Sequence, residues 1–170
     1  MRTVVVYESM YGNTHHVADC IADAAKRLGD VALVSVSGAT ADVLAGADLV
    51  FVGGPTHMHG MTSATSRDGA VEDADKKHLA LDTDAEGPGL RDWFDAIGEG
   101  SGTPAVAFDT RLQGSAALTG RASKGIAKRL HRHGFRLIVE PESFLVDKDN
   151  HLIDGEAERA RLWATEVLVL

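Results

Sequence analysis

The chain of 170 residues has little cysteine and no long apolar segment. Its one cysteine, Cys20, has no partner for an internal disulfide and no other soft ligands at zinc spacing, which argues against redox chemistry at sulfur. No apolar run approaches the roughly 20 residues that cross a bilayer. The apolar segment after Met1 is too short for the core of a signal peptide. These absences predict a cytoplasmic protein with no membrane interaction.

Aromatic and basic residues are also scarce. The chain has two Trp, two Tyr and five Phe, and 17 basic residues against 25 acidic ones give a formal net charge of -8. Because binding to nucleic acid requires a clustered basic field, this balance argues against nucleic acid as a partner. With 44% apolar and 25% charged residues, the composition is that of an ordinary globular protein. The length suits a single domain over residues 1–170.

Five short apolar segments predict a parallel sheet. They are rich in Val, Ile, Leu and Phe without a clean period of two, which indicates burial on both faces. The segments are Thr3–Tyr7, Val31–Val36, Leu49–Gly53, Pro104–Phe108 and Arg136–Val139.

Between these segments lie stretches with apolar residues at the three- and four-residue spacing of helices. Alternating strands and helices specify a doubly wound α/β domain, in which we expect a five-stranded parallel sheet of order 2-1-3-4-5. Residues 63–88 interrupt the pattern as an acidic excursion, with seven acidic residues against three basic ones. They are too many for a normal connection between a strand and a helix.

In open sheets of this kind, ligands bind beyond the carboxyl ends of the strands, where we expect residues 8–15, 54–61 and 109–114 to converge. The first segment has small polar residues followed by a helix with no acid in its first turn. Backbone N–H groups, the hydroxyls of Ser9 and Thr14 and the amide of Asn13 would favour an anion there, such as a phosphate monoester. The alternative is that Asn13 or Thr14 only caps the helix.

The segment Ser9-Met10-Tyr11-Gly12-Asn13-Thr14 resembles the phosphate-binding loop of flavodoxins, Ser/Thr-x-Ser/Thr-Gly-Asn-Thr, and its Ser-Met-Tyr-Gly form resembles flavodoxin-like NAD(P)H:quinone reductases. Gly54-Pro55-Thr56-x-x-x-Gly60-Met61 is similar to the second flavin loop of those reductases. The resemblance implies a flavodoxin-like fold and one FMN. The residues that it implies for the cofactor are Ser9, Met10, Tyr11, Gly12, Asn13, Thr14, Pro55, Thr56, His57, Met58, His59, Gly60, Asp109, Thr110 and Arg111.

The sequence departs from the flavodoxin pattern around the flavin ring. Flavodoxins commonly place the ring between a Trp and a Tyr of the second and third loops, and neither loop here has either residue. If Arg111 lies near the ring, its charge would stabilise the reduced, anionic flavin and favour two-electron reduction. The alternative is that Arg111 pairs with Asp109 or with the acidic excursion.

Other features leave the function open. The pair His57 and His59 is a weak ligand set, and we expect no metal. A basic stripe on one helix is formed by Arg121, Lys124, Lys128 and Arg132. It is either a solvated face or a docking site for an acidic partner or for the acidic excursion of a second copy, which would give a homo-oligomer.

Three functions follow from the sequence. The first is an FMN-binding electron-transfer protein that serves a redox partner protein or a small electron acceptor. The second is an NAD(P)H-dependent FMN quinone reductase, and the third is a flavodoxin-fold binding module that has lost its flavin. No catalytic residue is assigned.

Overall fold

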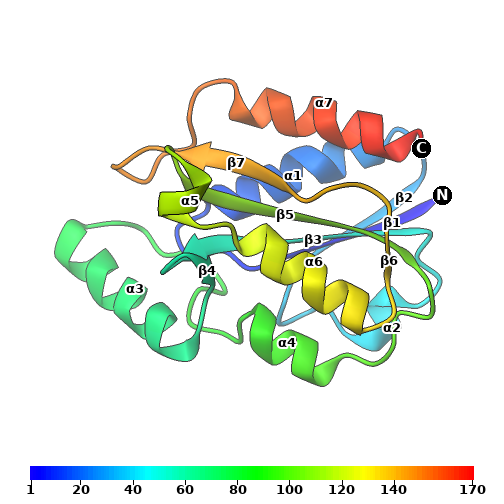
Figure 1. Cartoon of the computed structure of the whole chain (residues 1–170), viewed down its shortest axis with the longest axis horizontal. Helices are drawn as coiled ribbons and strands as arrows, with labels where there is room; N and C mark the ends of the chain where they lie inside the picture. Colours follow the sequence, from blue (N-terminus) through cyan, green and yellow to red (C-terminus); the bar gives the residue numbers. More distant parts are fainter.

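A parallel sheet forms the centre of the molecule, and its strands end on the same side (Figure 1). In this computed structural model, which describes residues 1–170, the strand order is β2-β1-β3-β5-β6, and β7 also pairs with β5. This arrangement confirms the predicted order 2-1-3-4-5. The strands are β1 (Arg2–Tyr7), β2 (Asp30–Ser35), β3 (Leu49–His57), β4 (Gly60–Met61), β5 (Pro104–Leu112), β6 (Arg136–Leu137) and β7 (Glu142–Val146). Only β4 is antiparallel, and it pairs with the end of β3.

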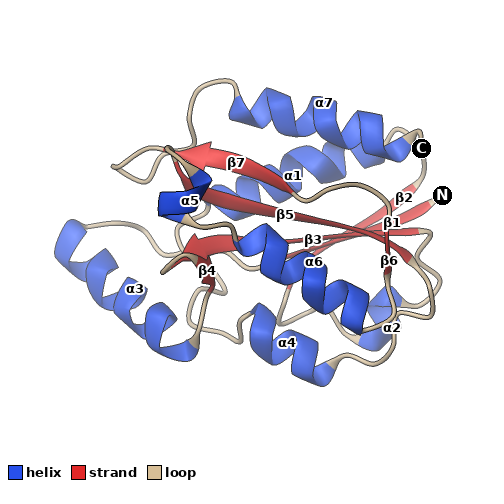
Figure 2. Ribbon diagram, viewed as in Figure 1, coloured by secondary structure: helices blue, strands red, loops and turns tan.

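Helices cover both faces of the sheet, which confirms the doubly wound α/β class (Figure 2). Helices α1 and α7 pack on one face, and α4 and α6 on the other. No helix combines the length and the apolarity that crossing a membrane requires. The helices are α1 (Asn13–Ala25), α2 (Ala41–Leu44), α3 (Ala64–Lys77), α4 (Leu90–Ala96), α5 (Ala116–Thr119), α6 (Ala122–Arg132) and α7 (Glu156–Leu168).

Two large clusters of 17 buried residues each form most of the core, one on each side of the sheet. Phe51, Phe108 and Phe144 lie on the side of α1 and α7. Trp93 and Phe94 lie on the side of α4 and α6, so they belong to the core and not to the edge where a cofactor would bind.

The last predicted strand is shorter than expected and is followed by another. Only Arg136 and Leu137 pair with β5 as β6, and the chain then leaves the sheet and returns as β7 beside the second half of β5. Pro141 lies in the gap between the two strands. Proline lacks a backbone N–H, so Pro141 cannot donate to the sheet, and pairing with β5 resumes at Glu142.

The central strand β3 continues beyond Gly53, where the sequence analysis ended it. Gly53 is needed there because a Cβ atom at this position would lie 2.1 Å from the ring of Phe108 on the neighbouring strand. In this strand glycine marks a close approach of a side chain, and not the end of the strand.

The acidic excursion contains the ordered helix α3, which lies beyond the carboxyl ends of the strands (Figure 1). Ser63 and Ser66 form a capping box at its start, with each hydroxyl accepting a hydrogen bond from the backbone N–H of the other residue, at 3.2 Å and 2.8 Å. The helix ends at His78, whose φ of 53° is left-handed. Only Ala70 and Ala74 are buried, so the helix has almost no apolar face.

The close approach at Gly53 predicts a specific loss of stability. Replacing Gly53 with Ala should lower the free energy of unfolding by about 1–3 kcal/mol, because the added methyl group overlaps the ring of Phe108. Gly69→Ala is the matched control, since a Cβ on this helical glycine meets no atom within 4 Å. Urea unfolding of both variants measures the effect. Equal stability of the two variants would contradict the packing described for β3.

Candidate functional site

A cleft of about 620 Å³ opens beyond the carboxyl ends of β1, β3 and β5. Its volume lies within the range of sites for small molecules and cofactors. Ten of the residues predicted for the cofactor line this cleft: Ser9, Met10, Tyr11, Asn13, Thr14, Pro55, Thr56, His57, Thr110 and Arg111. The structure therefore brings together the three segments that the sequence analysis selected.

Two walls of the cleft come from segments that the sequence analysis did not assign to the site. One wall is formed by Asp73 and Lys77 on α3 and by Leu79, which follows this helix. The other is formed by the end of β7 and the loop after it, residues 146–150. The acidic composition and the length of residues 63–88 were the only signals in the sequence for the first wall, and there was none for the second.

The turn at residues 9–14, here called the Ser9–Thr14 turn, lines the cleft and has backbone donors without acceptors in the protein. Gly12 has a φ of 91°, and its N–H donates to the Ser9 hydroxyl at 3.1 Å. The backbone N–H groups of Met10, Tyr11, Asn13 and Thr14 donate to no group of the protein. Helix α1 has no acid in its first turn and no side-chain cap. A helix start with free N–H groups is favourable for an anion.

The side chains at the end of the turn are held by neighbouring segments. The Thr14 hydroxyl lies 2.7 Å from that of Thr110 on β5, and both groups are buried. The Asn13 amide donates to the carbonyl of Asn150 at 2.8 Å and accepts from the N–H of Leu152 at 3.1 Å. Asn13 therefore holds the loop after β7 against the turn, a role that its position in the sequence did not indicate.

Two residues predicted for the cofactor cap helix α6. The Thr56 hydroxyl accepts from the N–H of Ala122 at 2.8 Å, and a carboxylate oxygen of Asp109 accepts from the N–H of Ser123 at 2.7 Å. Thr56 still lines the cleft, whereas Asp109 is fully buried against α6 and lies outside it. Burial raises the pKa of the Asp109 carboxyl above its usual range.

Arg111 lies at the cleft without a carboxylate partner. Its Nη1 donates to the carbonyl of Gly114 and to the hydroxyl of Thr119, both at 2.9 Å, and its Nε is buried with no acceptor. No ion pair joins it to Asp109 or to residues 63–88. The structure thus disagrees with the alternative that Arg111 is neutralised by those acids.

The turn between β3 and β4 places its side chains differently. His57 lines the cleft, and burial lowers the pKa of its imidazole, which favours the neutral form. Met58 and His59 have positive φ values of 48° and 70°, and the Met58 side chain is 88% exposed. With Gly60 they lie outside the lining of the cleft, and no group of three His, Cys, Asp or Glu residues is arranged to hold a metal.

The fold and the turn together are those of a flavodoxin-type α/β domain. The sequence model of the flavodoxin family matches residues 5–163, so the chain belongs to the flavodoxin family. No curated protein sequence matches it.

Solved structures share the fold over nearly their whole length. Flavodoxin 1 from Bacillus cereus has a TM-score of 0.67 at 20% identity, with 99% of this chain and 97% of that chain covered. A flavodoxin from the domain Archaea has a TM-score of 0.65 at 18% identity, with the same coverage. A WrbA-like protein from Agrobacterium tumefaciens has a TM-score of 0.59 at 20% identity, with 99% and 95% covered. At these identities the structural comparison establishes the architecture, and the family match over residues 5–163 confirms the predicted resemblance.

The burial of Asp109 predicts a pH dependence. The folded chain holds the Asp109 proton more tightly than the unfolded chain, because the pKa is raised from 3.8. The stability that this residue contributes is therefore complete below pH 3.8 and is lost as the pH rises through the raised pKa. Asp109→Asn should gain stability relative to the wild type between pH 4 and pH 7. Urea unfolding at pH 4 and pH 7 tests this, with Asp75→Asn at an exposed position as the control. A difference in free energy of unfolding between Asp109→Asn and wild type that is the same at both pH values would contradict it.

Proposed function

We propose that the protein binds FMN in this cleft and transfers electrons through it. The observation that carries the proposal is the Ser9–Thr14 turn, where free backbone N–H groups at the start of α1 open into a cleft of suitable volume. These donors suit the terminal phosphate of a nucleotide, which is a doubly charged acceptor. FMN, when bound, supplies the one- and two-electron chemistry.

The residues of the cleft fit the other parts of FMN. The hydroxyls of Ser9 and Thr14 would add to the backbone donors for the phosphate, and Thr56 would face the ribityl chain. His57, Thr110 and Arg111 remain for the ring. Tyr11 is the one Phe, Tyr or Trp residue in the lining, so the ring would have little aromatic contact.

The charges of the cleft bear on the redox chemistry. Its lining holds three basic residues, Lys77, Arg111 and Lys148, and three acidic ones, Asp73, Asp147 and Asp149. Arg111 is the basic residue with a buried donor that lacks an acceptor. A guanidinium near the flavin stabilises negative charge on the reduced ring. Because its position is already fixed, the protein does not have to reorganise when the ring is reduced.

This feature favours a second candidate function, an NAD(P)H-dependent FMN quinone reductase. An electron carrier passes single electrons to a redox partner protein or a small acceptor, whereas a reductase takes a hydride. Anaerobic titration separates the two: two separate one-electron steps support the carrier, and direct bleaching of the flavin by NAD(P)H supports the reductase.

FMN titration of stripped protein tests the proposed function. We expect one FMN per chain, and we expect Gly12→Ala to weaken binding about tenfold or more, because a φ of 91° strains any residue with a side chain and disturbs the turn. Gly46→Ala is the matched control: its φ is 70°, a Cβ there also meets no atom, and it lies away from the cleft. If the protein is colourless and binds no FMN in the titration, the result would instead support a binding module that has lost its flavin.

The charge of Arg111 predicts a change in potential. Arg111→Gln should lower the two-electron potential of bound flavin on the order of 30 mV, which corresponds to about 1.4 kcal/mol, because the reduced ring loses a stabilising cation. Potentiometric titration measures it, with the exposed Lys124→Gln on α6 as the control. An unchanged potential would remove Arg111 from the redox chemistry.

A further inference from the structure

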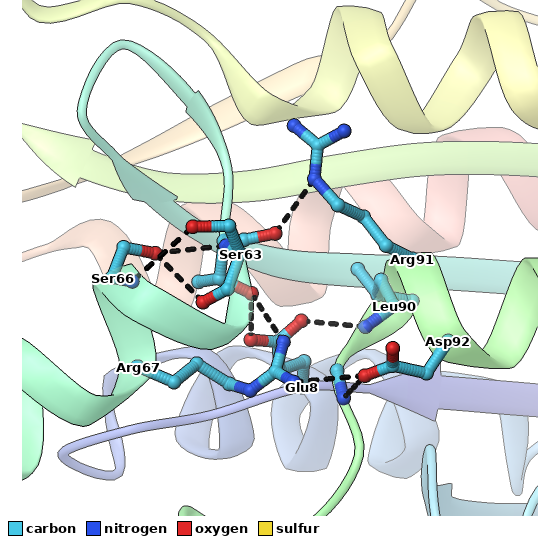
Figure 3. Close-up of polar contacts among 9 residues, drawn as sticks. Glu8, Ser63, Ser66, Arg67, Leu90, Arg91 and Asp92 are labelled. Atoms are coloured by element: carbon cyan, nitrogen blue, oxygen red, sulfur yellow. Dashed lines mark hydrogen bonds and ion pairs between the residues drawn. The ribbon is translucent and has the colours of Figure 1, made fainter.

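One buried carboxylate accepts hydrogen bonds from the residues that flank the segment 63–88 (Figure 3). Glu8, which directly precedes the Ser9–Thr14 turn, is 5% exposed. One of its oxygens accepts from the hydroxyl of Thr62, and the other accepts from the N–H of Leu90 at 2.7 Å. Thr62 and Leu90 flank the segment at its two ends. The residue before the turn therefore holds the start and the end of the segment together.

Further polar contacts surround this carboxylate (Figure 3). Arg67 on α3 donates to Asp92 on α4 at 2.8 Å, and the same carboxylate oxygen accepts from the N–H of Gly89 at 2.9 Å. The Nε of Arg91 donates to the carbonyl of Thr62 at 2.8 Å. The guanidinium of Arg67 packs so closely that a Cβ on Gly89 would lie 2.0 Å from it. Helix α3 is thereby fixed to the body of the domain at its first turn.

The turn itself contacts the middle of α3. The Tyr11 hydroxyl donates to the carbonyl of Ala70 at 2.8 Å. The Met10 side chain is 1% exposed and forms a small apolar cluster with Ala70 and Ala85, beside Tyr11 and Leu81. Two consecutive residues of the turn thus face α3 and the loop after it, and not the cleft alone.

The far part of the segment holds the turn from its other side. The N–H of Asp82 donates to the carbonyl of Met10 at 2.8 Å, and the Asp82 carboxylate lies 3.2 Å from Nδ1 of His15 on α1. The His15 ring stacks on Tyr7 with 4.3 Å between centroids, and its Nε2 lies 3.9 Å from Asp19. The segment therefore contacts residues on both sides of Gly12: Met10 and Tyr11 before it and His15 after it.

We propose that residues 63–88 are a fixed wall of the FMN site that positions the Ser9–Thr14 turn, with Tyr11 as the positioning residue that couples the two. The inference rests on the proposed function, because it takes FMN as the ligand. The N–H groups of Met10, Tyr11, Asn13 and Thr14 donate to no group of the protein, so backbone hydrogen bonds from these residues do not fix the turn. Contacts from outside the turn keep this arrangement. Thr110 and the loop after β7 hold its end, and residues 63–88 hold Met10 and Tyr11.

The coupling is reciprocal. If the wall favours the arrangement of the turn that binds phosphate, then binding of phosphate must stabilise the wall to the same extent. In the flavodoxin pattern, the third position of the turn is Ser or Thr; here it is Tyr11, whose hydroxyl is engaged with α3. That hydroxyl acts on the ligand through the position of the turn.

The test compares FMN with riboflavin, which has the same ring and no phosphate. Tyr11→Phe should weaken FMN about three- to tenfold, the effect of one lost hydrogen bond, and leave riboflavin affinity unchanged. The phenyl ring keeps the apolar contacts, so the variant retains its packing. Lys76→Ala is the control, because Lys76 lies on α3 outside the cleft and is 70% exposed. Fluorescence titration gives both dissociation constants.

Hydrogen exchange of the wild-type protein gives a second readout. FMN should slow exchange of the α3 amides, riboflavin should not, and the effect of FMN should shrink in Tyr11→Phe. The inference would be overturned if Tyr11→Phe lost FMN and riboflavin affinity equally, or lost neither. It would also be overturned if FMN left the exchange of the α3 amides unchanged. In each case the proposed function would stand. Wild-type protein that binds no FMN would overturn both.

Discussion

The open backbone donors of the Ser9–Thr14 turn are the constraint on which the site depends. Four N–H groups of the turn make no hydrogen bond within the protein, so the turn is held by contacts of other groups. Gly12 supplies the backbone conformation, Thr14 is held by Thr110, and Asn13 is held by the loop after β7. The two walls of the cleft therefore meet at this turn, and its chemistry and its architecture are parts of one arrangement.

The sequence analysis predicted what repeated patterns encode. The Val-rich segments correspond to the central strands, and the stretches with helical spacing between them correspond to helices. The predicted turn is the part of the cleft with the free donors. These features have local signals: apolar runs, periodicity and a short motif after a strand.

The features that the sequence analysis missed depend on tertiary contacts. Helix α3 buries only two alanines, so it has almost no apolar periodicity to detect. Glu8 is a common residue type, and only the fold shows that its carboxylate is buried between Thr62 and Leu90. Asp109 and Thr110 were both expected at the cofactor from their place at a strand end. Adjacent residues of a strand point to opposite faces, and only Thr110 lines the cleft.

The interruption between β6 and β7 affects the tendency of the sheet edge to pair with strands of other molecules. A long, flat edge strand offers unpaired backbone groups that other chains can pair with, which promotes aggregation. Here the outer edge beside β5 is divided into two short pieces, with Pro141 between them. No continuous template of donors and acceptors runs along this side, so the edge is poorly suited to intermolecular sheet extension.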